Sequence, residues 1–242
     1  MTLPRRVRRT AVASAVAVIA VVGPAGCDAG DVTGVGDGPA HVAEFEFTEQ
    51  VTELVVTTNH GNIVTRPAGG STTKVTETVR YRSTKPTTTR TQNGGTLTLS
   101  AGGCGSVLGA NATCSVDYTV EVPKGAKVNL RGSAGDVTLT GTTGGGELHS
   151  EAGDIKADGV SGALTASTDG GDIKLTFAAA PGNVKATSSA GDVTLRVPNG
   201  HYAVEASTDV GDRTVRVTND PSAASRLNLH SDVGNVSVLA TP

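Results

Sequence analysis

A short segment built around Gly-Asp recurs along the second half of the chain and constrains its fold more than any other feature. It reads SAGDVTLTG at residues 133–141, EAGDIKADG at 151–159 and SAGDVTLRV at 189–197, with looser copies at 169–177, 209–217 and 232–240. On both sides of the Gly, apolar residues alternate with polar ones. This period of two predicts two short strands that share one buried face and meet at a corner.

The glycines of this motif are the candidate corner residues. They are Gly61, Gly135, Gly153, Gly171, Gly191, Gly211 and Gly234. Gly suits a tight corner because it reaches positive φ without strain. The Asp or Asn that follows each Gly can accept a hydrogen bond from the backbone of its own turn, which would cap the corner. The Gly-Asp pair is therefore interpreted first as a geometric device.

Two short strands cannot bury an apolar face alone, so the copies are expected to stack and share one core. The chain holds only three Tyr, three Phe and no Trp, which suits a thin aliphatic interior. We predict an all-β, β-helix-like solenoid as a single domain over residues 42–242. Residues 83–95, STKPTTTRTQNGG, are interpreted as an exposed polar loop, and Glu77 interrupts the apolar row of the segment before it. Arg213 interrupts a later row and predicts that its strand bends or opens.

The N-terminus has the layout of an export signal. Four arginines at positions 5, 6, 8 and 9 precede the apolar run at residues 10–22, and Cys27 follows shortly after. The run is too short for a membrane-spanning helix, which needs ~20 apolar residues. An uncleaved signal anchor is the less favoured alternative.

The tripeptide Ala25-Gly26-Cys27 resembles a bacterial lipoprotein signal, with Pro24 where that pattern usually has an aliphatic residue. The resemblance implies that residues 1–26 are a helical signal peptide and that Cys27 is lipidated, for example with palmitate. Residues 27–41 would then be a flexible tether that holds the protein on the outer face of the cell membrane. The alternative is ordinary signal-peptidase cleavage nearby, with Cys27 lost or left free.

Loss of the leader leaves 16 basic against 23 acidic residues, a net charge of −7. That charge argues against nucleic acid as a partner, since proteins that bind nucleic acid carry a patch of basic residues. Cys104 and Cys114 flank a short segment of an exported chain and are predicted to form a disulfide. The two Cys have no neighbouring His or Cys, so a zinc site is the weaker reading.

The segment VDYTVEVPKGAKVNLRGSAGDVTLTG, residues 116–141, resembles the toast-rack family of bacterial adhesin-like β-repeat domains. The matching features are the V-x-Y-x-V-x-V-P-K-G entry strand and the corners of the form G-D-[VI]-x-[LV]. The resemblance covers about residues 50–240. It implies a cell-envelope β-solenoid, some relatives of which accompany envelope-stress systems, and it supplies no catalytic residues.

We therefore expect a non-catalytic binding or scaffold module of the envelope, in adhesion or stress sensing, with a glycan or protein partner. No catalytic residue, cofactor or metal is expected. A polysaccharide-active β-helix enzyme is one alternative, but it needs paired carboxylates in one groove. A calcium-binding solenoid is the other, in which Asp136, Asp154, Asp172, Asp192 and Asp212 would form a column. The known calcium repeat has the pattern G-G-x-G-x-D, which is absent here.

Overall fold

The computed structural model describes residues 39–82, 84–102 and 114–241, and within these ranges every regular element is a strand. The prediction of an all-β fold is confirmed. These residues include no helix with the length and hydropathy needed to cross a membrane. The predicted signal peptide, residues 1–26, and most of the predicted tether, 27–41, lie outside the described residues. The first strand begins at Ala40, slightly before the expected start of the domain at residue 42.

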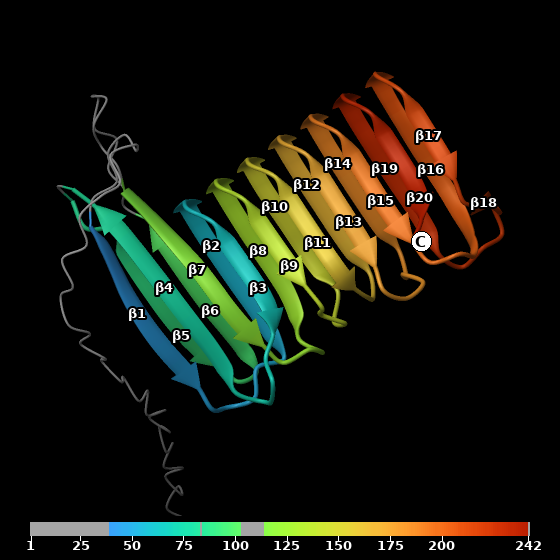
Figure 1. The fold of residues 1–242 in the computed structure, drawn as a ribbon. Helices are drawn as coiled ribbons and strands as arrows, with labels where there is room; N and C mark the ends of the chain where they lie inside the picture. The colour runs from blue at the N-terminus through green and yellow to red at the C-terminus, as the bar shows by residue number, and fades with distance from the viewer. Residues whose placement is uncertain (1–38, 83, 103–113, 242) are drawn as a thin grey trace, which may run out of the picture.

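Two ten-stranded sheets lie face to face and form an elongated stack (Figure 1). Sheet A contains, in spatial order, β1 (Ala40–Phe47), β4 (Thr73–Tyr81), β7 (Cys114–Val122), β3 (Ile63–Pro67), β9 (Val137–Thr140), β11 (Ile155–Val160), β13 (Ile173–Phe177), β15 (Val193–Val197), β20 (Val236–Ala240) and β17 (Arg213–Arg216). Sheet B contains β18 (Thr218–Asn219), β16 (His201–Val210), β19 (Arg226–Val233), β14 (Val184–Ala190), β12 (Leu164–Gly170), β10 (Gly146–Ala152), β8 (Lys127–Ala134), β2 (Glu53–His60), β6 (Thr96–Gly102) and β5 (Thr87–Asn93).

Each repeat of the sequence forms one rung, defined here as a strand of sheet B, its corner, and the following strand of sheet A. Strands of successive rungs pair in parallel, and equivalent positions of the motif lie opposite one another, as Gly146 does with Leu164 and Leu164 with Val184. This arrangement is consistent with the predicted β-solenoid. The stack is not sequential throughout, because the β19–β20 rung lies between the β14–β15 and β16–β17 rungs.

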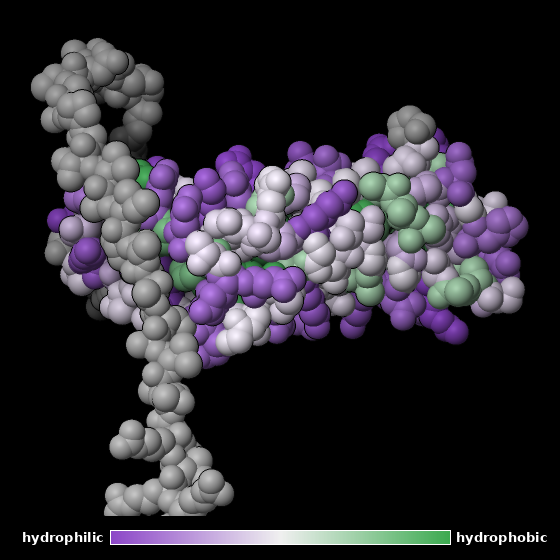
Figure 2. Space-filling view, turned by 90° about the horizontal axis from the view of Figure 1, so that it is seen from below, coloured by the Kyte–Doolittle hydropathy of each residue, from purple (hydrophilic) through white to green (hydrophobic). Residues whose placement is uncertain are grey.

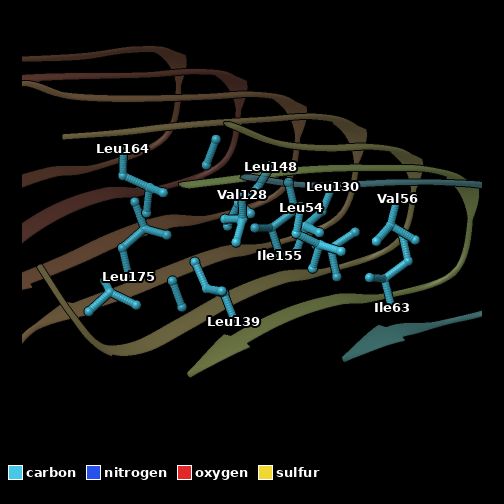
Figure 3. Close-up of a cluster of buried hydrophobic side chains, with 14 of the residues drawn as sticks. Leu54, Val56, Ile63, Val128, Leu130, Leu139, Leu148, Ile155, Leu164 and Leu175 are labelled. Carbon is cyan, nitrogen blue, oxygen red and sulfur yellow. The ribbon is translucent and has the colours of Figure 1, made fainter. Parts of the chain in front are cut away.

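The interior of the stack is built from the alternating aliphatic residues. Leu54, Val128, Leu139 and Ile173 are fully or almost fully buried between the two sheets. Figure 3 shows such side chains pointing toward one another from the two sheets. The largest buried rings are those of Tyr118, Phe177 and Tyr202. The period-two pattern therefore marks the buried face of nearly every strand.

The end of the stack that holds β1 and β5 is closed by antiparallel strands. The prediction of an exposed loop over residues 83–95 is wrong for residues 87–93, which form β5 and pair along its whole length with β6. The segment is rich in Thr, which favours strands. It has no apolar face because the alternate, partly buried positions of β5 are the polar Thr88, Arg90 and Gln92. A strand whose inward positions are polar shows no hydrophobic alternation in its sequence.

Glu77 and Arg90 form an ion pair beneath this closed end. Glu77 is only 4% exposed, and its Oε2 lies 2.7 Å from Nη1 of Arg90. The Arg90 guanidinium lies 4.1 Å from the centroid of the Phe45 ring, close enough for a cation–π contact. The acidic residue that interrupts an apolar row in the sequence is thus a paired, buried charge.

The opposite end of the stack is more open. Its last rung in space is β16–β17, in which the inward-facing Val204, Ala206 and Val215 are only partly buried. Arg213 belongs to this rung and is exposed. The charged residue is tolerated in an inward row because β17 is the edge strand of sheet A and has a paired neighbour, β20, on one side only.

Candidate functional site

The seven predicted corner glycines all lie where a strand of sheet B turns into a strand of sheet A. Their φ angles fall between +125° and +153°. A Cβ atom on Gly171 would lie 2.6 Å from the carbonyl carbon of Gly153 in the adjacent rung. Backbone is therefore stacked on backbone along this edge of the molecule, and a side chain at these positions has no space.

The Asp or Asn after each corner glycine joins its rung to the next one. Oδ1 of Asp136 accepts a hydrogen bond from the amide of Asp154 at 2.9 Å, and Oδ1 of Asp154 accepts from the amide of Asp172 at 2.8 Å. The series, called the corner ladder below, runs in space through Asp117, Asn62, Asp136, Asp154, Asp172, Asp192, Asn235 and Asp212. The predicted bond to the residue's own turn is wrong, because the amide of the neighbouring rung is the partner.

A second ladder of hydroxyl groups runs beneath the first. The Ser or Thr three residues before a corner glycine donates a hydrogen bond to the corner carbonyl of an adjacent rung. Ser150 donates to Gly135 at 3.0 Å, and Ser188 donates to Gly171 at 2.9 Å. Thr168, Ser231 and Thr208 make the same contact in their rungs. These hydrogen bonds satisfy the buried polar groups of the corner and offset the free-energy cost of removing them from water.

The corner carboxylates have structural partners, which bears on the calcium alternative. Each accepting Oδ1 is occupied by a backbone amide, and Oδ2 of Asp172 binds Nζ of Lys174 at 2.9 Å. The hydrogen bond from Lys174, followed by that from the Asp192 amide, lowers the pKa of Asp172. In the described part of the chain, the corner carboxylates do not bring three ligand atoms together. The ladder accounts for the recurring Asp without a bound ion.

Replacement of Asp154 separates geometry from charge. Asp154→Asn is expected to change the free energy of unfolding by less than ~0.5 kcal/mol, because an amide oxygen also accepts the bond from the Asp172 amide, as Asn62 and Asn235 do in their rungs. Asp154→Ala removes the acceptor and is expected to cost about 1 kcal/mol. Urea denaturation of the two variants measures the difference. Equal losses in both would show that the carboxylate charge matters.

Outward-facing side chains of sheet B form regular rows across the rungs. The residues four positions before a corner glycine share one row, which contains Arg131, His149, Ser167, Thr187, His230 and Ser207 in spatial order. Two His–Ser contacts occur in it. Nδ1 of His149 lies 2.9 Å from Oγ of Ser167, and Nδ1 of His230 lies 2.9 Å from Oγ of Ser207. Histidines that are scattered in the sequence are thus aligned by the fold.

The row beside it brings together residues that no motif of the sequence marks as a site. Asp209 and Asp232 both stand two positions before a corner glycine, and their strands β16 and β19 are neighbours. Together with His230 they form a group whose ligand atoms all lie within 4.8 Å of one another. Counting back from the corner glycine places the two Asp residues in one row and His230 in the row beside it. The three residues become neighbours only because the β19–β20 rung lies next to the β16–β17 rung.

The cysteine predictions are largely outside the described residues. Cys27 and Cys104 both lie there, while Cys114 is the first residue of β7. Lipidation of Cys27 and the Cys104–Cys114 disulfide stay predictions. The described surface seen in Figure 2 is mostly hydrophilic or neutral, and hydrophobic residues gather there only in small patches.

Solved bacterial structures share low sequence identity with the chain. A putative cell adhesion protein from Clostridium sporogenes is 11% identical, with a TM-score of 0.49, covering 83% of this chain and 100% of that protein. A putative adhesin from Bacteroides fragilis is 16% identical, with a TM-score of 0.44 and coverage of 83% and 97%. One from Parabacteroides distasonis is 14% identical, with a TM-score of 0.33 and coverage of 85% and 98%. No curated protein sequence matches the chain significantly.

The family assignment rests on a sequence model that covers more than half of the chain. The model for the Toastrack DUF4097 family matches residues 110–238. This range contains the entry strand β7 and the corners from Gly135 to Gly234, which are the features that carried the resemblance in the sequence. The chain belongs to the Toastrack DUF4097 family.

Proposed function

We propose that this protein is an exported, lipid-anchored, non-catalytic binding module of the cell envelope. The observation that carries the proposal is that one end of the stack lies near the N-terminus and the other lies far from it. β1, the strand nearest the N-terminus, and β17 form opposite ends of sheet A (Figure 1). A lipid on Cys27 followed by a short tether would enter at the β1 end. The open β16–β17 rung would then be the part of the domain farthest from the membrane.

The far end offers a surface suited to a partner. Val210 on β16 and Val233 on β19 are 63% and 54% exposed, which is high for large aliphatic residues. A shallow hollow lies on the same terminal rung, at the opposite end of β16 from Val210, and is lined by Asn199, Gly200, His201, Arg216, Val217 and Thr218. Apolar side chains beside polar groups are typical of a binding surface. An envelope glycan or an envelope protein would fit this mixed chemistry.

The stiffness of the stack supports a scaffold role rather than catalysis. Both ladders tie each corner to its neighbour, so the outer rows are presented in fixed register. A glycosidase needs two carboxylates that flank a bound sugar in a groove. Asp209 and Asp232, which lie together, occupy the open outer face of sheet B. This geometry favours recognition of a partner over cleavage of a polysaccharide.

One experiment with two arms tests this function. In the first, the full-length chain is expressed in bacteria with radiolabelled palmitate. The wild type is expected to carry label and to fractionate with membranes, whereas Cys27→Ser loses both. Label that persists in Cys27→Ser would refute anchoring at this residue. The proposed Cys104–Cys114 disulfide is read in the same samples from the mass of the peptides before and after reduction.

The second arm measures saturable binding of the purified protein to envelope fractions, divided into protease-treated glycan and membrane protein extract. Val210→Glu at the far end is expected to reduce binding at least tenfold. Val42→Glu is the matched control, since Val42 is 62% exposed but lies on β1 at the opposite end. Equal binding by both variants would contradict recognition at the far end, and release of sugar fragments would contradict the non-catalytic assignment.

A further inference from the structure

The group formed by Asp209, His230 and Asp232 lies on the outer face of sheet B near the far end of the stack. Nε2 of His230 lies 2.9 Å from Oδ1 of Asp232, and the ligand atoms of all three residues lie within 4.8 Å of one another. In the described ranges this is the one set of three His, Cys, Asp or Glu side chains that converges so closely. The set combines one imidazole nitrogen with two carboxylates.

The register of β16 and β19 places two negative charges side by side. Ser207 lies opposite His230 and Thr208 opposite Ser231, so the next outward positions, Asp209 and Asp232, are also neighbours. Like charges opposite one another on adjacent strands are destabilising. Among the described residues, neither carboxylate pairs with a Lys or Arg, and the contact of Asp232 is with His230. A bound cation would remove this repulsion.

Both ring nitrogens of His230 have a partner, so the imidazole is held in an orientation that is compatible with metal ligation. Oγ of Ser207 lies 2.9 Å from Nδ1 of His230. When Nδ1–H donates to this hydroxyl, the lone pair of Nε2 is directed toward the carboxylates. Histidines that bind metals almost always donate their other ring N–H to a neighbouring group, which fixes the tautomer and the ring.

We propose that Asp209, His230 and Asp232 bind a divalent transition-metal ion of the zinc class, with Ser207 as a positioning residue. Imidazole with carboxylates suits zinc, and three protein ligands leave one tetrahedral position for water or for an atom of a partner. Zinc–ligand bonds of ~2.0–2.2 Å require ligand atoms ~3.3 Å apart. The His230–Asp232 contact is already short, and the exposed side chain of Asp209 can rotate to close the site. This inference is independent of the proposed binding function.

The outer face of sheet B provides an internal control on the strands β10 and β12. His149 and Ser167 repeat the His–Ser contact at 2.9 Å, and Glu151 and Asp169 stand two positions further along their strands. The residue types are almost the same as in the proposed site, but these carboxylates do not converge with His149. A comparison of the two places separates the effect of geometry from that of composition.

Isothermal titration of the full-length chain, purified without a histidine tag, with zinc chloride tests the proposal. The wild type is expected to show one saturable site. His230→Ala and Asp209→Asn are expected to weaken zinc binding at least 100-fold, and Ser207→Ala roughly tenfold. His149→Ala, the matched control, is expected to keep the wild-type affinity. Melting curves in the presence of a chelator show whether each variant is folded.

Three results would overturn the proposal. The first is a wild type without a saturable zinc site. The second is a loss of zinc affinity in His149→Ala as large as that in His230→Ala, which would indicate diffuse binding along the outer face of sheet B. The third is calcium binding as tight as zinc binding and unaffected by His230→Ala, which would indicate attraction by the carboxylates alone.

Discussion

Replacement of Gly171 by Ala is expected to destabilise the fold by about 3–5 kcal/mol, although it adds only one methyl group. Gly171 has φ near +149°, a conformation that residues with a Cβ rarely adopt. The added Cβ would also lie 2.6 Å from the carbonyl carbon of Gly153. That backbone cannot easily move, because the amide of Gly153 bonds to Gly170 and its carbonyl accepts from Thr168. The destabilisation from backbone strain and that from steric overlap with Gly153 therefore add.

Two other glycines separate these contributions. Gly159 has φ near +62° but open space around a Cβ, so Gly159→Ala carries the backbone strain alone and is expected to cost about 1–2 kcal/mol. Gly125 has open space and no positive φ, so Gly125→Ala is expected to cause no loss of stability. Chemical denaturation followed by circular dichroism measures all three. If Gly171→Ala costs no more than Gly159→Ala, the stacking of corners is not the source of the effect.

The parts of the fold that could be predicted are those that repeat. Alternation around each Gly-Asp pair marks two strands and their buried face, and equivalent positions meet in neighbouring rungs, as Leu164 and Val184 do. The structural role of Asp154 also follows from its recurrence. Its partner could not be predicted, because the amide of Asp172 comes from another rung and reaches Asp154 only when the rungs are stacked.

The unpredicted features depend on order in space. The sequence gives no sign that β19 inserts between β14 and β16, since copies of one motif stack equally well in several orders. The cluster of Asp209, His230 and Asp232 depends on that insertion. β5 escaped detection for a different reason. Its partly buried positions are polar, with Arg90 paired to Glu77, so its sequence resembles that of a loop.

Arg90 lies on β5, the strand that the sequence did not predict. Arg90→Ala is expected to destabilise the fold by about 3 kcal/mol. Its guanidinium pairs with the buried Glu77, whose other oxygen accepts a bond from Thr88 at 3.1 Å. The neighbourhood is apolar enough that burial, together with the Glu77 carboxylate, raises the pKa of Tyr118. Without Arg90, a carboxylate that is 4% exposed would lack its countercharge. The loss of the contact with Phe45 adds to the effect.

Urea denaturation of Arg90→Ala, Glu77→Gln and the double variant measures this dependence. The double variant is expected to be more stable than Arg90→Ala alone, because removing the second charge relieves the unpaired carboxylate. Arg66→Ala is the control. Its partner Glu121 lies on the outer face of sheet A, and the Arg66 side chain is 56% exposed, so the loss is expected to stay below ~1 kcal/mol. If Arg90→Ala is no more damaging than Arg66→Ala, water reaches Glu77 and the closed end of the stack does not depend on the pair.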